Sequence, residues 1–313
     1  MATEPLLAGL DMAVVERGNS AGSSVLFDYW MLTKPEVNFL IAVATAAAFR
    51  LGCPKPVMDF PWILLLHTLL GTVLVASGAG ALNQVIERHF DAKMRRTGRR
   101  PIAAGRIEPV RALVFGTLLS VAGALYLAVK VRPAASLLAL LTLGGYLFLY
   151  TPLKRRTPLC TLVGAFPGAM PVLIGYIAAA ERLDVQAWLL YAVVFLWQFP
   201  HFMAIAWMYR EDYARAGFLV LPAGELRERF VIFQSFGVSL LFFPLALIPA
   251  ATSELGLSYS VGMLAVSSLF SYYSARFAFR RSNVTARRLL VVSIIYLPVI
   301  FVLMIFSRCP AHP

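Results

Sequence analysis

Residues 62–82 read WILLLHTLLGTVLVASGAGAL and contain no Asp, Glu, Lys or Arg. A helix needs about 20 mainly apolar residues to cross the hydrocarbon core of a bilayer, so this stretch predicts a transmembrane helix. Comparable stretches recur along the chain and predict about nine spans. They lie near 35–52, 62–82, 112–130, 134–150, 159–180, 187–208, 230–252, 256–275 and 289–306.

The composition supports an all-α polytopic membrane protein. Of the 313 residues, 59% are hydrophobic and 14% are charged, whereas a soluble domain averages about 45–50% and about 25%. This excludes a disordered chain, which needs low hydrophobicity. The three cysteines form no CxxC pair, which excludes a disulfide scaffold and a cysteine-based zinc finger.

The net charge of +12 comes from loops rather than from one basic face, so it indicates membrane topology and no nucleic-acid partner. Most Lys and Arg fall on the side of the membrane that holds the N-terminus, which predicts a cytoplasmic N-terminus and an extracytoplasmic C-terminus. We expect a cytoplasmic tail (1–30) with a short interfacial helix near 25–32, one transmembrane domain (31–308) and an extracytoplasmic tail (309–313). The acidic tail resembles no signal or transit peptide, which favours a bacterial inner membrane.

The stretch 83–101, NQVIERHFDAKMRRTGRRP, follows the second span directly. Asn83, Glu87 and Asp91 are spaced i, i+4 and i+8 and therefore share one face of a helix. Oxygen ligands of this kind suit Mg²⁺ and a substrate phosphate, and the arginines that follow match phosphate geometry. The alternative is a solvated basic loop. Polar groups at the edge of an uncharged span favour the functional interpretation.

The stretch 197–217, WQFPHFMAIAWMYREDYARAG, also ends an apolar span. Glu211 and Arg215 have the i, i+4 spacing of a local ion pair, so Asp212 is the better candidate for a second metal or substrate contact. His201 lies within the span. It has two interpretations: a hydrogen bond between packed helices, or a porphyrin ligand, an acid–base group or another polar substrate contact.

The stretch 146–158, YLFLYTPLKRRTP, carries Lys154, Arg155 and Arg156. These residues either anchor the topology or form the outer wall of the same phosphate pocket. The two acidic stretches follow spans two and six and are thus four spans apart on one side of the membrane. This spacing suggests a duplicated four-helix unit with the substrate site at the repeat interface.

These strings resemble the UbiA-type intramembrane prenyltransferases, and most closely the branch that acts on haem. The resemblance rests on TKPEV (33–37), ERHFDAKMRRTGRRP, YTPLKRRT, GAMPVLIGY and HFMAIAWMYREDYARAG, which occur in the expected order. Two departures stand out. Ala216 occupies the position four residues after Asp212, where the wider family tends to carry a second acid. Cys160 stands where an Asn is expected.

The resemblance implies nine helices around a central cavity. The implied reaction transfers farnesyl from farnesyl diphosphate to a vinyl group of haem b with addition of water, giving haem O and diphosphate, with Mg²⁺ required. Implied partners besides the two substrates are the bilayer and a haem A synthase or a terminal oxidase assembly. The implied metal ligands are Asn83, Glu87, Asp91 and Asp212. The implied diphosphate contacts are Lys93, Arg99, Arg100, Lys154, Tyr209, Arg210 and Tyr213. The implied catalytic residues are Asp91, Asp212 and His201.

Two alternatives remain open at this stage. A prenyltransferase of the same superfamily that acts on a hydroxybenzoate or quinone precursor would keep the Mg²⁺–diphosphate site and differ in its acceptor cavity. A transporter or membrane scaffold would use the intramembrane acids for ion or proton coupling. Metal-dependent affinity for a prenyl diphosphate separates both enzymes from the transporter.

Overall fold

The computed structural model describes residues 24–53, 55–251 and 257–307, and the regular elements in these ranges are all helical. In chain order they are α2 (Val25–Leu32), α3 (Pro35–Gly52), η1 (Val57–Asp59), α4 (Trp62–Asp91), α5 (Pro109–Lys130), α6 (Pro133–Gly144), η2 (Gly145–Tyr150), α7 (Thr151–Leu153), α8 (Cys160–Ala180), α9 (Val185–Met208), α10 (Arg210–Ala216), α11 (Leu226–Val231), η3 (Ile232–Gly237), α12 (Phe242–Ala251), α13 (Leu257–Phe279) and α14 (Asn283–Phe306). Residues 1–23 of the predicted N-terminal tail and the predicted C-terminal tail, 309–313, lie outside the described residues.

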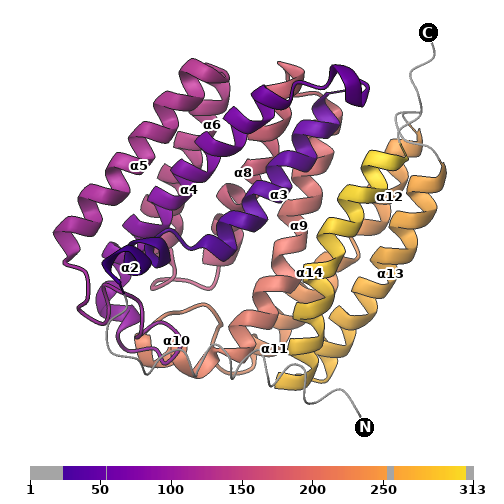
Figure 1. Ribbon diagram of the computed structural model, residues 1–313. Coiled ribbons are helices and arrows are strands. Elements are labelled where there is room, and N and C mark those ends of the chain that lie inside the picture. Colours follow the sequence, from indigo (N-terminus) through magenta and orange to yellow (C-terminus); the bar gives the residue numbers. More distant parts are fainter. Residues whose placement is uncertain (1–23, 54, 252–256, 308–313) are drawn as a thin grey trace.

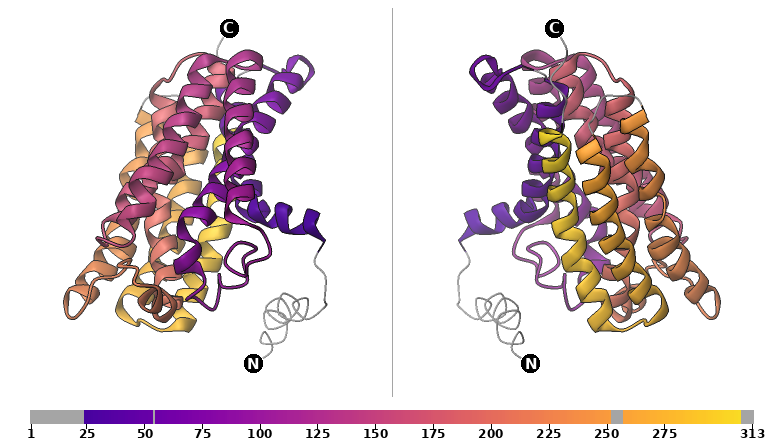
Figure 2. Two further views of the ribbon diagram at one scale, coloured as in Figure 1. Left: turned by 90° about the vertical axis from the view of Figure 1, so that its left-hand side faces the viewer. Right: turned by 90° about the vertical axis from the view of Figure 1, so that its right-hand side faces the viewer.

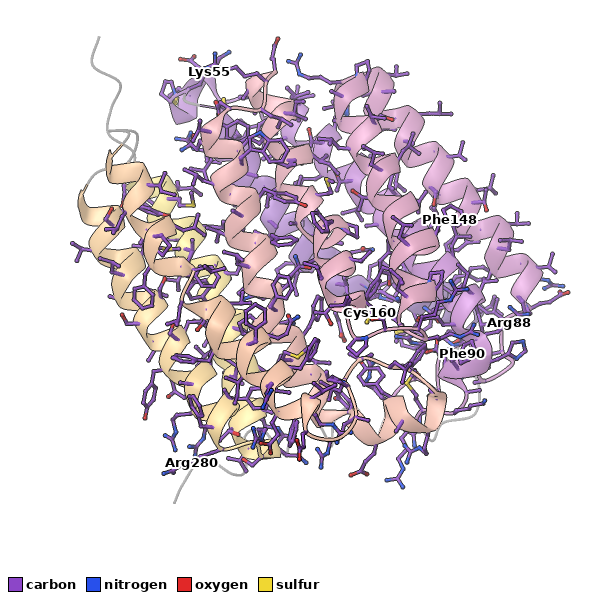
Figure 3. The ribbon with its side chains drawn as sticks, turned by 180° about the vertical axis from the view of Figure 1, so that it is seen from behind. Lys55, Arg88, Phe90, Phe148, Cys160 and Arg280 are labelled. Atoms are coloured by element: carbon purple, nitrogen blue, oxygen red, sulfur yellow. The ribbon has the colours of Figure 1, made fainter. Side chains whose placement is uncertain are left out.

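The long helices stand side by side in one bundle (Figure 1). Within the described residues, seven segments are long and apolar enough to cross a membrane. They are Trp62–Asp91, Pro109–Lys130, Pro133–Leu153, Cys160–Ala180, Val185–Met208, Leu226–Ile248 and Asn283–Phe306. The helices α3 and α13 run alongside them and complete the predicted set of about nine. Large apolar side chains such as Phe148 face outward (Figure 3). The chain is a multi-pass membrane protein, and the predicted fold class is confirmed.

The helix ends explain where predicted and observed spans differ. The second span continues as helix through Asp91 because the polar face of 83–91 is buried against other segments. The last helix begins at Asn283, ahead of the predicted 289, because Ser282 caps it: Thr285 N donates to Ser282 Oγ, and Ser282 N donates to Thr285 Oγ1, both at 3.1 Å. Apolar periodicity misses such polar first turns.

Small residues bring neighbouring helices into close contact. A Cβ atom added at Gly78 of α4 would lie 2.6 Å from the backbone oxygen of Gly116 on α5. One added at Gly175 of α8 would lie 2.1 Å from the backbone oxygen of Thr45 on α3. Because lipid gives helices no hydrophobic reason to associate, close backbone approach of this kind is a main source of stability in membranes.

The basic loops gather at one end of the bundle, which we call the basic end. Arg88 and Arg280 lie there and Lys55 lies at the opposite end (Figure 3). The helix α2 projects sideways from the basic end (Figure 2), and Arg106 Nε donates to Asp28 Oδ1 at 3.0 Å to hold it there. The predicted short helix near 25–32 is therefore present. Its location in the membrane interface and the orientation of the chain stay predictions.

Close packing of α3 on α8 generates a stability prediction. Replacing Gly175 with Ala should lower the melting temperature of the detergent-solubilised protein, because overpacking costs about 1–3 kcal/mol. Gly144→Ala is the matched control, since an added Cβ there meets nothing within 4 Å and Ala favours helix over Gly. Equal melting temperatures for the two variants would contradict the packing argument.

Candidate active site

A row of three polar side chains ends α4 at the basic end. We call Asn83, Glu87 and Asp91 the polar row; their exposed fractions are 1%, 5% and 1%. Buried carboxylates are stable only when they are paired or hydrogen-bonded. The helix therefore brings the predicted residues onto one buried face, and their burial requires partners from other segments.

Each member of the polar row accepts a hydrogen bond from a basic side chain of another segment. The pairs are Lys34 Nζ to Asn83 Oδ1 (2.8 Å), Lys154 Nζ to Glu87 Oε1 (2.9 Å) and Arg100 Nη1 to Asp91 Oδ2 (2.7 Å). We call the donors the three cations. They converge from the α2–α3 junction, the loop after α7 and the loop after α4. The site thus combines carboxylates, which can ligate a metal, with cationic groups, which can bind a phosphate.

Lys34 was not among the predicted site residues. It sits between α2 and α3 with a φ of 54°, and its Nζ also lies 3.4 Å from the Tyr146 hydroxyl. Burial lowers the pKa of Lys34, and the charges of Arg100 and Lys154 act in the same direction. Its position in the string TKPEV was the available signal. No spacing rule connects residue 34 to a helix that ends at Asp91.

Lys154 follows a distorted stretch of helix. Residues Gly145–Tyr150 form a π-helix, a wider turn that is frequent at functional sites. Thr151 Oγ1 donates to Tyr146 O at 2.8 Å, and Lys154 Nζ lies 4.6 Å from the centroid of the Tyr150 ring. Burial alone would lower the pKa of Lys154, but the Glu87 carboxylate helps to hold that pKa above its ordinary value, so the ammonium stays charged.

The loops that carry the three predicted stretches contact one another. Leu219 N donates to Lys154 O at 2.7 Å, and the rings of Phe90 and Phe218 lie 5.6 Å apart. The guanidinium of Arg155 lies 4.5 Å from the centroid of the Phe90 ring. Phe90 and the buried Cys160 are both found at the basic end (Figure 3). The stretch 146–158 therefore contacts the end of α4 and the loop after α10, and its role as the wall of a phosphate pocket stays a prediction.

Asp212 on α10 is buried and holds the loop after α4. Its Oδ2 accepts from Arg96 N at 3.2 Å, and its Oδ1 pairs with Arg215. The expected pairing of Glu211 with Arg215 is wrong, because the i, i+3 spacing of this short helix places Arg215 beside Asp212 instead. Glu211 is exposed, with Oε1 3.7 Å from Arg210 Nη2.

The donor set at Asp91 fits a metal ion. Asp91 Oδ1 is buried and has no hydrogen-bond partner among the described residues, whereas both oxygens of Asp212 are bonded. Nowhere in the described ranges do three or more His, Cys, Asp or Glu side chains form a ligand cluster. This is compatible with Mg²⁺, which binds one or two carboxylates together with water and substrate phosphates rather than an all-protein cage.

Four of the seven predicted diphosphate contacts divide into two groups. Arg100 and Lys154 bind the polar row. Lys93 and Arg99 are exposed; the ammonium of Lys93 lies 6.0 Å from the Phe90 ring centroid. The structure therefore brings Arg100 and Lys154 to the polar row and leaves Lys93 and Arg99 on the surface of the basic end.

The residues around Asp212 point in different directions. The ring of Tyr209 lies 5.0 Å from the guanidinium of Arg96, and the ring of Tyr213 lies 6.1 Å from that of Phe218. Arg210 Nη1 donates to Asn283 Oδ1 at 2.9 Å. Tyr209 and Tyr213 thus line loops of the site, while Arg210 turns toward the start of α14.

His201 belongs to α9, and its side chain contacts α14. Its Nδ1 is 2.8 Å from Ser293 Oγ, its ring stacks on Trp197 with centroids 4.6 Å apart, and Trp197 Nε1 donates to Ser293 O at 2.7 Å. This is the helix-packing hydrogen bond of the first interpretation. A role toward haem stays a prediction.

Comparisons with known proteins identify the family of this chain. Residues 39–304 match the model of the UbiA prenyltransferase family. The chain is 45% identical to the protein named protoheme IX farnesyltransferase from Solibacter usitatus (strain Ellin6076), and the match covers 90% of this chain and 98% of that protein.

Two solved structures share the fold. A digeranylgeranylglyceryl phosphate synthase matches with a TM-score of 0.73 at 15% identity, covering 90% of this chain and 98% of its own. A UbiA homolog from Archaeoglobus fulgidus bound to GPP and Mg²⁺ matches with a TM-score of 0.62 at 14% identity, covering 88% and 99%. At these identities the likeness concerns the fold alone. Because the family model spans well over half of the chain and a relative of 45% identity covers nearly all of it, the chain belongs to the UbiA prenyltransferase family.

Proposed function

We propose that this intramembrane prenyltransferase transfers the farnesyl group of farnesyl diphosphate to a vinyl group of haem b, with addition of water, and releases haem O and diphosphate. The observation that carries the proposal is the polar row with its three cations, in a chain 45% identical to a protein named for this reaction. A hydroxybenzoate acceptor and a transport function have no comparable support.

The polar row would hold Mg²⁺. The structure of the A. fulgidus homolog is bound to GPP and Mg²⁺, which supports a Mg²⁺ requirement by analogy. Asp91 is the strongest candidate ligand because its Oδ1 is buried and lacks a hydrogen-bond partner within the described residues. When bound, Mg²⁺ neutralises the negative charge that builds on the departing diphosphate. Asp212 supports the site by holding the loop that carries Arg96 and Arg100.

The three cations would bind the diphosphate. Lys34, Lys154 and Arg100 stand within hydrogen-bond distance of the polar row, so a diphosphate at the row meets donors from three sides. Fixed positive groups aimed at the leaving group stabilise the charge that develops there, and they are most effective where water is excluded. The exposed Lys93 and Arg99 would attract the anionic substrate toward the site.

The chemistry needs little proton transfer from the protein. As the bond between farnesyl C1 and the diphosphate oxygen breaks, the vinyl π electrons form the new carbon–carbon bond. The resulting positive charge sits on the carbon next to the porphyrin ring. Water adds there and loses one proton, which leaves the hydroxyl group. The protein's task is therefore to orient the two substrates and to keep water away until the carbon–carbon bond has formed.

The proposal also covers the domain, the membrane and its orientation, and the consumer of the product. We place the single catalytic domain at 31–308, in a bacterial inner membrane, with the basic end facing the cytoplasm because basic loops are retained there. The N-terminal tail is then cytoplasmic and the C-terminal tail extracytoplasmic. A haem A synthase or a terminal oxidase is the expected consumer of the product.

Replacing Asp91 tests the donor site. Asp91→Asn should lower farnesyl transfer by at least about a hundredfold, because the carboxylate that would hold Mg²⁺ at the diphosphate is lost. Membranes are incubated with haem b, farnesyl diphosphate and Mg²⁺, and the product is measured by mass spectrometry as haem plus one farnesyl plus water. Asp59→Asn, an exposed acid at the opposite end, is the control. Full activity of Asp91→Asn would rule out its assignment.

Arg100 separates donor binding from acceptor binding. Arg100→Ala should raise KM for farnesyl diphosphate by about tenfold, the value of one charge-assisted hydrogen bond, and leave KM for haem b near the wild-type value. Steady-state rates at varied concentrations of each substrate measure this. Arg111→Ala, a surface arginine paired with Glu108, is the control. An equal rise in both constants would indicate a structural role instead.

His201 tests the acceptor side. His201→Ala and Ser293→Ala both remove the hydrogen bond between α9 and α14, so both should lower the melting temperature. His201→Ala should lower it further, because the ring stacked on Trp197 is also lost. A histidine that also contacts haem should raise KM for haem b further in His201→Ala than in Ser293→Ala. Equal KM values in the two variants would leave His201 with packing alone.

A further inference from the structure

A cavity lies at the basic end and includes no residue of the polar row. It measures about 490 Å³ and lies between the end of α9 and the start of α14. Its lining residues are Met208, Tyr209, Asn283, Val284 and Arg287. This volume is in the range of ligand sites, which is about 300–1,000 Å³. The cavity offers apolar, aromatic and cationic groups together.

Arg210 adds a second guanidinium at the edge of this cavity. Its Nη1 donates to Trp207 O at 2.8 Å and to Asn283 Oδ1 at 2.9 Å, and the guanidinium lies 5.1 Å from the centroid of a Trp207 ring. These contacts fix its plane beside a lining residue. Nη2 lies 3.7 Å from Glu211 Oε1, which is too far for a hydrogen bond. The guanidinium group of Arg210 can therefore still donate two parallel hydrogen bonds to a carboxylate.

One lining residue, Tyr209, connects the cavity with the loop after α4. Tyr209 lines the cavity, and its ring is 5.0 Å from the guanidinium of Arg96. The backbone N–H of Arg96 donates to Asp212, in the loop that also carries Arg100. Tyr209 therefore lines the cavity and also contacts Arg96, in the loop that carries Arg100.

We infer that this cavity binds the two propionate groups of haem, with Arg210 and Arg287 as the cationic groups. The inference rests on the proposed function, because it names the acceptor subsite of that reaction. Haem is an apolar disc whose two carboxylates occupy one edge and whose vinyl groups lie on the opposite part of the ring. Met208 and Val284 offer apolar contacts to the disc.

This placement accounts for the orientation that the reaction requires. Arginines at the end of the bundle keep the propionates at the polar boundary, where a charge is least costly, while the apolar ring enters the membrane. The vinyl groups then point away from the cavity mouth and into the bundle. Anchoring the charged edge therefore selects which edge of the porphyrin meets the farnesyl group.

The test compares haem b with its dimethyl ester, in which both propionates are neutral. With wild-type protein we expect KM for the ester to be about tenfold higher than KM for haem b. Arg287→Ala should raise KM for haem b by about tenfold and leave KM for the ester unchanged. KM for farnesyl diphosphate should not change. Arg288→Ala is the matched control, because Arg288 is exposed on the same helix turn and does not line the cavity.

Three results would overturn the inference while the proposed function stands. They are equal KM values for haem b and its ester, a rise in KM for the ester in Arg287→Ala, and an effect of Arg287→Ala that occurs in vesicles containing phosphatidylglycerol but not in phosphatidylcholine alone. The last would assign the arginines to an anionic lipid. Absence of any farnesylated haem with wild-type protein would instead refute the proposed function, and this subsite with it.

Discussion

Two carboxylates and an amide are buried at the end of an apolar helix, and the basic end is organised around the cations that compensate them. Removing one partner from a buried ion pair costs about 3–5 kcal/mol. Arg100, Lys154 and Lys34 come from three separate segments, so pairing with α4 fixes the loop after α4, the loop after α7 and the junction of α2 with α3. The same contacts that stabilise this end of the fold assemble the donor site.

The sequence predicted the features that depend on local periodicity, which are the spans and the residues that share one helix face. Apolar runs located the spans, and the spacing of Asn83, Glu87 and Asp91 placed them on one face of α4, where they are found. Partners from distant segments could not be located in this way. Lys34 reaches Asn83 across 49 positions, and Arg210 turns to Asn283 across 73. Local spacing also failed at Glu211, because Arg215 pairs with Asp212.

Two features of the rest of the bundle position these sites: close contacts between helices, and local departures from regular apolar helix. Glycines at helix contacts, such as Gly78 of α4 packed against α5 and Gly175 of α8 packed against α3, leave little freedom for α4 and α8 to move. The π-helix at Gly145–Tyr150 and the polar first turn of α14 are deviations from regular apolar helix. Both lie beside a proposed substrate group, the diphosphate in one case and the haem propionates in the other.

The central claim is that the polar row and its cations bind a metal–diphosphate complex. Its most direct test is equilibrium binding of farnesyl diphosphate to the purified full chain without haem, with and without Mg²⁺. We expect Mg²⁺ to tighten binding by at least about tenfold in the wild-type protein and not in Asp91→Asn. Binding that is equally tight without Mg²⁺, or an unchanged Mg²⁺ effect in Asp91→Asn, would contradict this claim.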